Sequence, residues 1–243
     1  MTTSKWRLLA AYEKLFAGQL YRHRSNNQGD QLAVELYEDL YAIGNSPKYM
    51  ADVDELRRGI SLKNVRVGIS ARRGDGTLGQ FIPGEVVISE PGYRVHRGPV
   101  ATLDIGVEVK ILNKAMIKQI NERITSLKKQ AEYFVRGRDG RARGNPITIA
   151  IIGVNSADYT VGYEGERSYK TDGKTHAHPF EEAAAAEERI RNEVVPEFDE
   201  TIILRYKATN EEPYPFSWAD PASASREYAA SLVRICAEYE RRF

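Results

Sequence analysis

The sequence has very little cysteine, with Cys236 alone among 243 residues. One cysteine excludes an intramolecular disulfide and any zinc site built from several cysteines. Cys236 falls in the apolar phase of a C-terminal helical pattern that also contains Leu232, Val233 and Tyr239. We therefore expect this thiol to be buried in the core rather than reactive.

Long hydrophobic runs are also missing. No apolar stretch approaches the roughly 20 residues that are needed to cross a bilayer. The first 24 residues interleave apolar and charged side chains at helical spacing, unlike the basic and then apolar layout of a signal peptide. These patterns predict a cytoplasmic protein that makes no contact with membranes.

Excess charge of one sign is absent, because 35 basic and 34 acidic residues leave a net charge of +1. The chain as a whole therefore has no electrostatic attraction for nucleic acid, and phosphate binding would require a local basic patch. Hydrophobic residues make up 42% and charged residues 28% of the sequence, which is typical of a globular protein.

Residue spacing predicts an α/β fold in which a mixed β-sheet is flanked by helices, with helical additions at both ends. We expect one domain over 1–243, with a helical N-terminal part at 1–60, a core at 61–155, and a peripheral strand and helices at 156–243. The expected helices are the N-terminal segment before residue 25, then 30–43, 51–59, 113–136, 180–194 and 221–243, and the expected strands are 64–70, 84–90, 100–112, 147–154 and 201–208.

The strand at 100–112 carries charged residues on one face only. Because side chains alternate along a strand, Asp104, Gly106, Glu108 and Lys110 share one face, and the other face is entirely apolar. A carboxylate beside an ammonium suits hydrolysis of a phosphodiester: carboxylates bind Mg²⁺, and a lysine can stabilise charge that develops on phosphate. Glu-x-Lys alone is a common tripeptide, so its place on this strand carries the argument.

With its elements in this order, the chain resembles the PD-(D/E)xK (restriction-endonuclease-like) nuclease superfamily over about 29–154. Glu108 and Lys110, in VEVK, match the family's second acidic ligand and its lysine. Glu35, in GDQLAVELYEDL, is similar to the glutamate that members often carry on the first core helix. Gln130 and Tyr133, in KKQAEYF, are similar to a Gln-x-x-x-Tyr feature of some exonuclease relatives, with a spacing one residue shorter.

The family's first acid normally lies on the preceding strand, and three residues compete for that role here. Asp104 shares a face with Glu108 but lies four positions back, about 13 Å along a regular strand, so the two can share an ion only if Gly106 forms a bulge. Glu85, in IPGEVVI, follows a proline as the family's first acid commonly does. Glu90 ends the same expected strand. We rank Asp104 first, Glu85 second and Glu90 third.

The resemblance implies a Mg²⁺-dependent endonuclease, with Mn²⁺ as a possible substitute, that hydrolyses double-stranded DNA as a homodimer in a type II restriction or anti-phage role. Asp104, Glu108 and Glu85 would hold the metal, with Lys110 and Glu35 completing the catalytic set. Arginines in glycine-rich segments are the expected phosphate contacts; these are Arg72, Arg73, Arg94, Arg97, Arg138, Arg141 and Arg143.

Two other interpretations remain open. The first keeps the catalytic core but assigns it to DNA repair or to structure-specific cleavage. The second is a non-catalytic nucleic-acid-binding protein, in which Glu108 and Lys110 form a solvated ion pair on an exposed edge strand.

Overall fold

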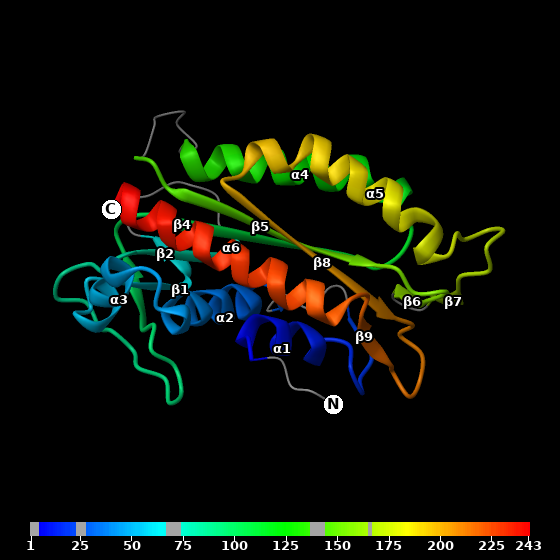
Figure 1. The fold of residues 1–243 in the computed structure, drawn as a ribbon, viewed down its shortest axis with the longest axis horizontal. Coiled ribbons are helices and arrows are strands. Elements are labelled where there is room, and N and C mark those ends of the chain that lie inside the picture. Colours follow the sequence, from blue (N-terminus) through cyan, green and yellow to red (C-terminus); the bar gives the residue numbers. More distant parts are fainter. Residues whose placement is uncertain (1–4, 23–27, 67–73, 137–143, 165–166) are drawn as a thin grey trace.

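The computed structural model describes residues 5–22, 28–66, 74–136, 144–164 and 167–243 (Figure 1). The α-helices are α1 (Arg7–Lys14), α2 (Gln28–Ile43), α3 (Pro47–Asp54), α4 (Met116–Val135), α5 (Pro179–Glu193) and α6 (Pro221–Arg242), and a short 3₁₀ helix, η1, spans Val195–Glu197. The strands are β1 (Arg58–Arg66), β2 (Gly76–Gln80), β3 (Arg97–Val100), β4 (Ile105–Leu112), β5 (Ile147–Asn155), β6 (Val161–Glu164), β7 (Arg167–Lys170), β8 (Glu200–Ala208) and β9 (Phe216–Trp218).

Seven strands form one mixed sheet in the order β3-β1-β2-β4-β5-β8-β9, and β6 and β7 form a separate antiparallel pair. β2 lies between β1 and β4 and runs antiparallel to both. β4, β5 and β8 are parallel, and β9 runs antiparallel to β8. β3 pairs with the outer side of β1 in parallel. β4 therefore lies in the middle of the sheet.

Helices cover both faces of this sheet (Figure 1). α4 and α5 lie on one face, and α1, α2 and α6 lie on the other. Two clusters of buried side chains fill the two layers, and every residue of β5, which passes between them, is buried. Among the described residues, no helix has both the length and the apolar character that a membrane span requires.

Several helices begin where the sequence supplies a capping residue followed by proline. The side chain of Ser46 accepts a 3.0 Å hydrogen bond from the N–H of Tyr49 at the start of α3, and Asp220 accepts a 3.0 Å bond from Ser223 at the start of α6. Each cap satisfies an N–H group that the helix itself leaves without an acceptor.

The expected α/β class, with a mixed sheet between two helical layers, is confirmed. α4, β5, α5, β8 and α6 also lie where residue spacing predicts them. Cys236 is buried in the core, and burial raises its thiol pKa to about 11.

Three expectations for the middle of the chain are wrong. Residues 84–90 form a loop with an isolated bridge rather than a strand. The expected strand 100–112 is divided between β3 and β4, and the third helix ends at Asp54 because β1 begins as early as Arg58.

Sequence patterns also missed β2, whose sequence GTLGQ is typical of a turn. Its glycines are required by close packing. A Cβ on Gly76 would lie 2.4 Å from the Cβ of Ala33 in α2, and a Cβ on Gly79 would lie 2.1 Å from the carbonyl oxygen of Thr102. Close approach of neighbouring backbone and helix explains glycine in this strand.

Candidate active site

The charged face of β4 points toward α4. Ile105, Val107 and Val109 belong to the core cluster on the opposite side, with α1, α2 and α6. On the α4 side, a Cβ on Gly106 would lie 2.7 Å from the ring of Phe134, so the helix rests directly on the strand at this glycine. Glu108 and Lys110 follow on the same face.

Glu108 and Lys110 form an ion pair in a sheltered position. Oε1 of Glu108 accepts a hydrogen bond from Nζ of Lys110, and the two side chains are only 10% and 20% exposed. This differs from a solvated pair on an edge strand, because β4 is flanked by β2 and β5. The ammonium compensates for the cost of removing a carboxylate from water.

Asp75, which sequence reasoning did not select, lies beside this pair. Asp75 forms a bend immediately before β2, whose Gly76 is the partner of Val107. Oδ2 of Asp75 accepts a 2.7 Å hydrogen bond from the N–H of Val109. The Asp75 carboxylate therefore lies against the backbone of the residue between Glu108 and Lys110, just before β2 begins.

The N-terminal end of α2 packs against Asp75. A Cβ on Gly29 would lie 2.4 Å from Cγ of Asp75, so a side chain at this position would displace the Asp75 carboxylate. The N-terminal end of a helix carries a partial positive charge, which favours a carboxylate close to it. The start of α2 therefore favours the charged form of the Asp75 carboxylate.

Gln130 is a buried polar residue on the side of α4 that faces the sheet. It lies four residues before Phe134, which packs on Gly106. β4 and β5 are parallel and joined by α4, so the helix runs in the opposite direction to β4. Four helical residues span about 6 Å, which is about the length of two strand residues. This spacing places Gln130 at the level of Glu108.

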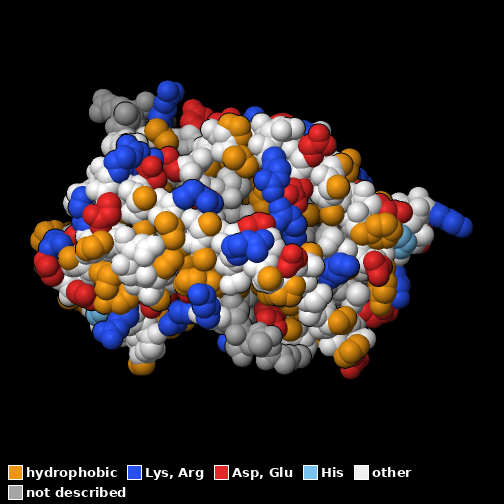
Figure 2. Space-filling view, viewed as in Figure 1, with side chains coloured by type: hydrophobic (Ala, Val, Ile, Leu, Met, Phe, Trp, Pro, Cys, Tyr) orange, Lys and Arg blue, Asp and Glu red, His pale blue; other side chains and the backbone are white. Residues whose placement is uncertain are grey.

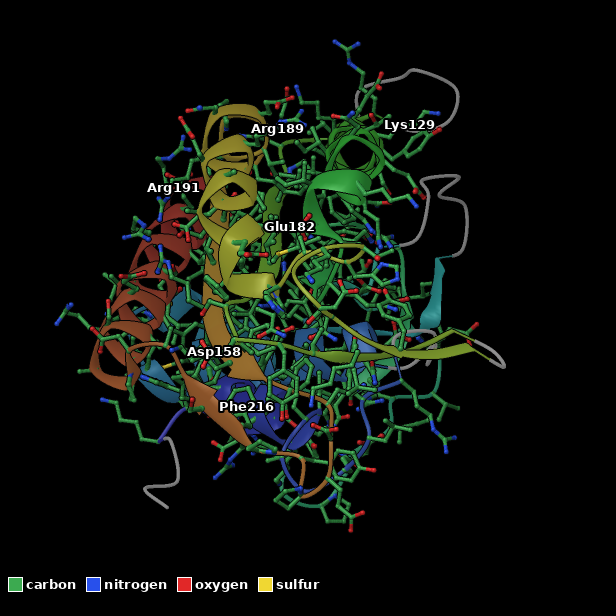
Figure 3. The ribbon with its side chains drawn as sticks, turned by 90° about the vertical axis from the view of Figure 1, so that its right-hand side faces the viewer. Lys129, Asp158, Glu182, Arg189, Arg191 and Phe216 are labelled. Carbon is green, nitrogen blue, oxygen red and sulfur yellow. The ribbon has the colours of Figure 1, made fainter. Side chains whose placement is uncertain are left out.

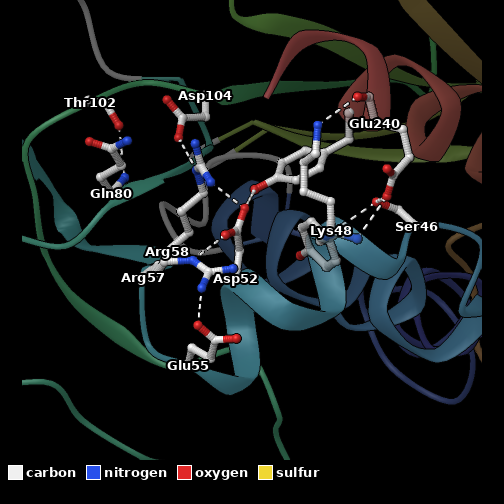
Figure 4. A network of polar contacts seen from close by, with 12 residues as sticks. Ser46, Lys48, Asp52, Glu55, Arg57, Arg58, Gln80, Thr102, Asp104 and Glu240 are labelled. Atoms are coloured by element: carbon white, nitrogen blue, oxygen red, sulfur yellow. Dashed lines mark hydrogen bonds and ion pairs between the residues drawn. The ribbon is translucent and has the colours of Figure 1, made fainter.

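Asp104 does not join this group. It is buried, and its Oδ2 accepts a 2.6 Å hydrogen bond from Nε of Arg58, which also pairs with Asp52 (Figure 4). Burial raises the pKa of Asp104, while the Arg58 guanidinium opposes that rise. The ladders on both sides of β4 keep a continuous register, so Gly106 forms no bulge, and Asp104 stays about 13 Å from Glu108 along the strand.

The other expected acids also lie elsewhere. Glu85 is exposed in the loop after β2, and since β2 runs antiparallel to β4, that loop leaves the sheet near the start of β4 rather than near Glu108. Glu90 pairs with Arg97 at 3.2 Å. Glu35 is buried on the α1 side of α2, where it accepts hydrogen bonds from Arg7 at 2.7 Å and from Tyr93 at 2.9 Å.

Of the expected phosphate contacts, two are described. Arg94 is exposed, and its backbone N–H donates to Glu38, while Arg97 lies on the edge strand β3, three strands from β4. Neither is close to the Glu108 group. Arg72, Arg73, Arg138, Arg141 and Arg143 lie outside the described residues.

The acids near Lys110 carry the ligand type that a hard divalent cation prefers. Mg²⁺ usually takes one or two protein carboxylates and completes its shell with water and substrate oxygens. Asp75 and Glu108 provide two carboxylates, and the carbonyl of Val109 points to the same edge of β4 as its N–H group. No cluster of three or more acidic, histidine or cysteine side chains suited to a metal occurs in the part of the chain that the structure describes.

Comparisons of the chain with family models, with curated proteins and with solved structures found no match. The assignment of a function therefore depends on the chemistry of these side chains and on the arrangement of the elements that hold them.

Proposed function

We propose that this protein is a Mg²⁺-dependent nuclease that hydrolyses phosphodiester bonds of DNA at a site formed by Asp75, Glu108 and Lys110. The observation that carries the proposal is the position of the Asp75 carboxylate, 2.7 Å from the backbone nitrogen of the residue between Glu108 and Lys110. Asp75 directly precedes β2, and Glu108 and Lys110 lie on the neighbouring strand β4.

The order of elements supports the proposal. When α3 and the edge strand β3 are set aside, the chain from Gln28 to Asn155 runs helix, three strands, helix, strand. This is the order on which the resemblance to PD-(D/E)xK nucleases rests. Asp75 precedes the middle strand of the three, so it also takes the place of that family's first acid, although the residue before it is glycine instead of proline.

Each side chain then has a definite role. The carboxylates of Asp75 and Glu108 would hold the cation, with Mn²⁺ as a possible substitute. A bound divalent cation would supply an activated water and neutralise charge on the phosphate. The ammonium of Lys110, fixed by the sheltered strand, would orient the attacking water and stabilise the extra negative charge of the transition state.

The substrate contacts are proposed from sequence position. Arg72 and Arg73 come just before Asp75 in the chain, and Arg138, Arg141 and Arg143 follow α4, whose residues Gln130 and Phe134 border the site. Contacts between arginine and phosphate give affinity that falls as salt concentration rises. Binding of DNA should therefore weaken steeply with salt.

A digest of supercoiled plasmid with the purified protein tests the proposal. Nicked and linear products should form with Mg²⁺ or Mn²⁺ and should be absent with EDTA. Sequencing of the ends separates the biological roles: a defined duplex sequence supports restriction or anti-phage defence, and preference for branched or nicked DNA supports repair. Intact plasmid in every metal, together with DNA binding, would instead favour a non-catalytic binding protein.

A further inference from the structure

The outer edge of β8 is open over its first half. β9 pairs only with Tyr206, Lys207 and Ala208, and Ala219 bonds the carbonyl of Arg205, so no strand among the described residues pairs with the segment from Glu200 to Leu204 on this side. An open strand edge presents backbone N–H and C=O groups that can pair with another chain. In Figure 1, β8 crosses between α5 and α6.

The outward backbone groups belong to Thr201 and Ile203. The carbonyl of Tyr206 accepts a hydrogen bond from the N–H of Ser156 on the β5 side. The carbonyl of Arg205 accepts one from the N–H of Ala219 on the outer side. Because successive residues of a strand direct their backbone groups to opposite sides, residues 201 and 203 point outward with Arg205.

A cavity of about 200 Å³ lies along this edge, so the flanking helices leave it uncovered. Its walls include Arg191 of α5 and Ala230 and Arg234 of α6, and its floor includes Ile202. Figure 3 shows Arg191 on the side of α5 toward α6, and Figure 2 shows basic side chains mixed with acidic ones across this face.

Charge along the groove is ordered in a self-complementary way. At the end nearest Arg205, Glu187 of α5 and Glu227 of α6 both bond that arginine. Toward the other end, α5 and α6 carry Arg191 and Arg234, and Arg234 pairs with Glu200 at the start of β8. Each helix therefore has an acid near one end of the open edge and an arginine near the other.

We propose that the open edge of β8 binds the same edge of a second copy of this chain, in an antiparallel two-fold dimer. With the axis at Ile202, Thr201 of one copy lies opposite Ile203 of the other, so the outward groups of both residues pair reciprocally. The same rotation brings Glu227 of one copy toward Arg234 of the other, and these side chains are 50% and 58% exposed. Ala230, small and exposed, lies between them on α6.

This assembly joins the two sheets into one continuous sheet. Glu108, Ala150 and Thr201 lie in one row across β4, β5 and β8. A two-fold axis perpendicular to the sheet leaves the Glu108 sites of both copies on the same side, five strand spacings or about 24 Å apart. The interface itself is inferred from β8, α5 and α6 alone, independently of the nuclease proposal.

Light scattering of the full chain tests the interface. The wild-type protein should have twice the 27.4 kDa mass of one chain at high micromolar concentration. Ala230→Glu should reduce the mass to that of a monomer, because it places a charge at the centre of the contact. Ala222→Glu, on an exposed part of α6 outside the cavity, should leave the dimer intact. A monomeric wild type would overturn the proposal, and so would a dimer that survives Ala230→Glu.

Cross-linking tests the register in a Cys236→Ser background. Ile202→Cys should form a disulfide between copies on oxidation, because opposed residues at a non-hydrogen-bonded position lie about 4.5 Å apart. Ile203→Cys should not, because each copy of that residue lies opposite Thr201. A dimer that cross-links at 203 and not at 202 would refute this register. If the wild type is a monomer and binds an extended peptide at this edge, the edge recognises a peptide and the dimer proposal is wrong.

Discussion

Oδ2 of Asp75 lies 2.7 Å from the backbone nitrogen of Val109, the residue between Glu108 and Lys110. This hydrogen bond holds an acid that directly precedes β2 against the backbone of β4. Asp104 is closer to Glu108 in sequence, but it forms an ion pair with Arg58 at the other end of the strand. The proposed metal pair is therefore Asp75 with Glu108, across two strands rather than along one.

Lys110→Ala should abolish cleavage and lower stability when no metal is present. Without the ammonium, the sheltered carboxylate of Glu108 loses its ion pair with Lys110, which we expect to cost about 1–2 kcal/mol. Mg²⁺ should restore part of the melting temperature, since a cation would again neutralise the acids. Thermal melts with EDTA and with Mg²⁺ measure this, and Lys118→Ala, exposed on α4, is the control. Full cleavage by Lys110→Ala would remove that residue from the mechanism.

Glu35→Gln should change stability and not chemistry. Glu35 bonds Arg7 and Tyr93 on the far side of α2, so its replacement should cost about 1 kcal/mol in the free energy of unfolding. The cleavage rate per folded molecule should match that of the wild type. Urea unfolding and a plasmid digest of the same preparation check both parts, and a large loss of rate in a fully folded sample would return Glu35 to the catalytic set.

Gly106→Ala should destabilise the protein, because the new Cβ would lie 2.7 Å from the Phe134 ring that covers the strand. Overpacking of this kind typically costs about 1–3 kcal/mol. Adding Phe134→Leu should recover part of the loss, so the two changes should be less than additive in urea unfolding. Strict additivity would show that the helix does not rest on this glycine.

Asp199 should contribute to unfolding in acid. Burial opposes ionisation of this carboxyl, but hydrogen bonds from Arg242 and Thr148 more than offset it and lower its pKa. Its stabilisation is present above the unfolded pKa of about 3.9 and is lost as pH falls through the lower folded value. Asp199→Asn should flatten the pH dependence of stability below about pH 4. Acid unfolding monitored by circular dichroism measures this. An unchanged acid limb would contradict this.

The sequence predicted the parts of the fold whose periodicity is strong. β5 is buried along its whole length and appears as an unbroken apolar run, and α4 repeats apolar residues at helical spacing. β2 could not be found in this way, because its glycines serve contacts with Ala33 and Thr102 that are distant in sequence. Such contacts leave no local pattern.

The same reason explains the outcome for the site. Glu108 and Lys110 are two residues apart, so alternation along one strand was enough to place them together. Asp75 joins them through the pairing of β2 with β4, which the sequence does not reveal once β2 itself is missed. Asp104 was favoured by its nearness in sequence, whereas its actual partner, Arg58, lies 46 positions away.

The most direct test of the proposed site compares Asp75→Asn with Asp104→Asn in a plasmid digest with Mg²⁺, at a temperature where both variants are folded. We expect Asp75→Asn to reduce the rate of nicking by about 100-fold or more, as loss of a group that stabilises the transition state does. Asp104→Asn should cut at close to the wild-type rate while melting at a lower temperature, because Arg58 loses a charged partner. Wild-type cleavage by Asp75→Asn, or loss of cleavage in folded Asp104→Asn, would contradict the proposed site.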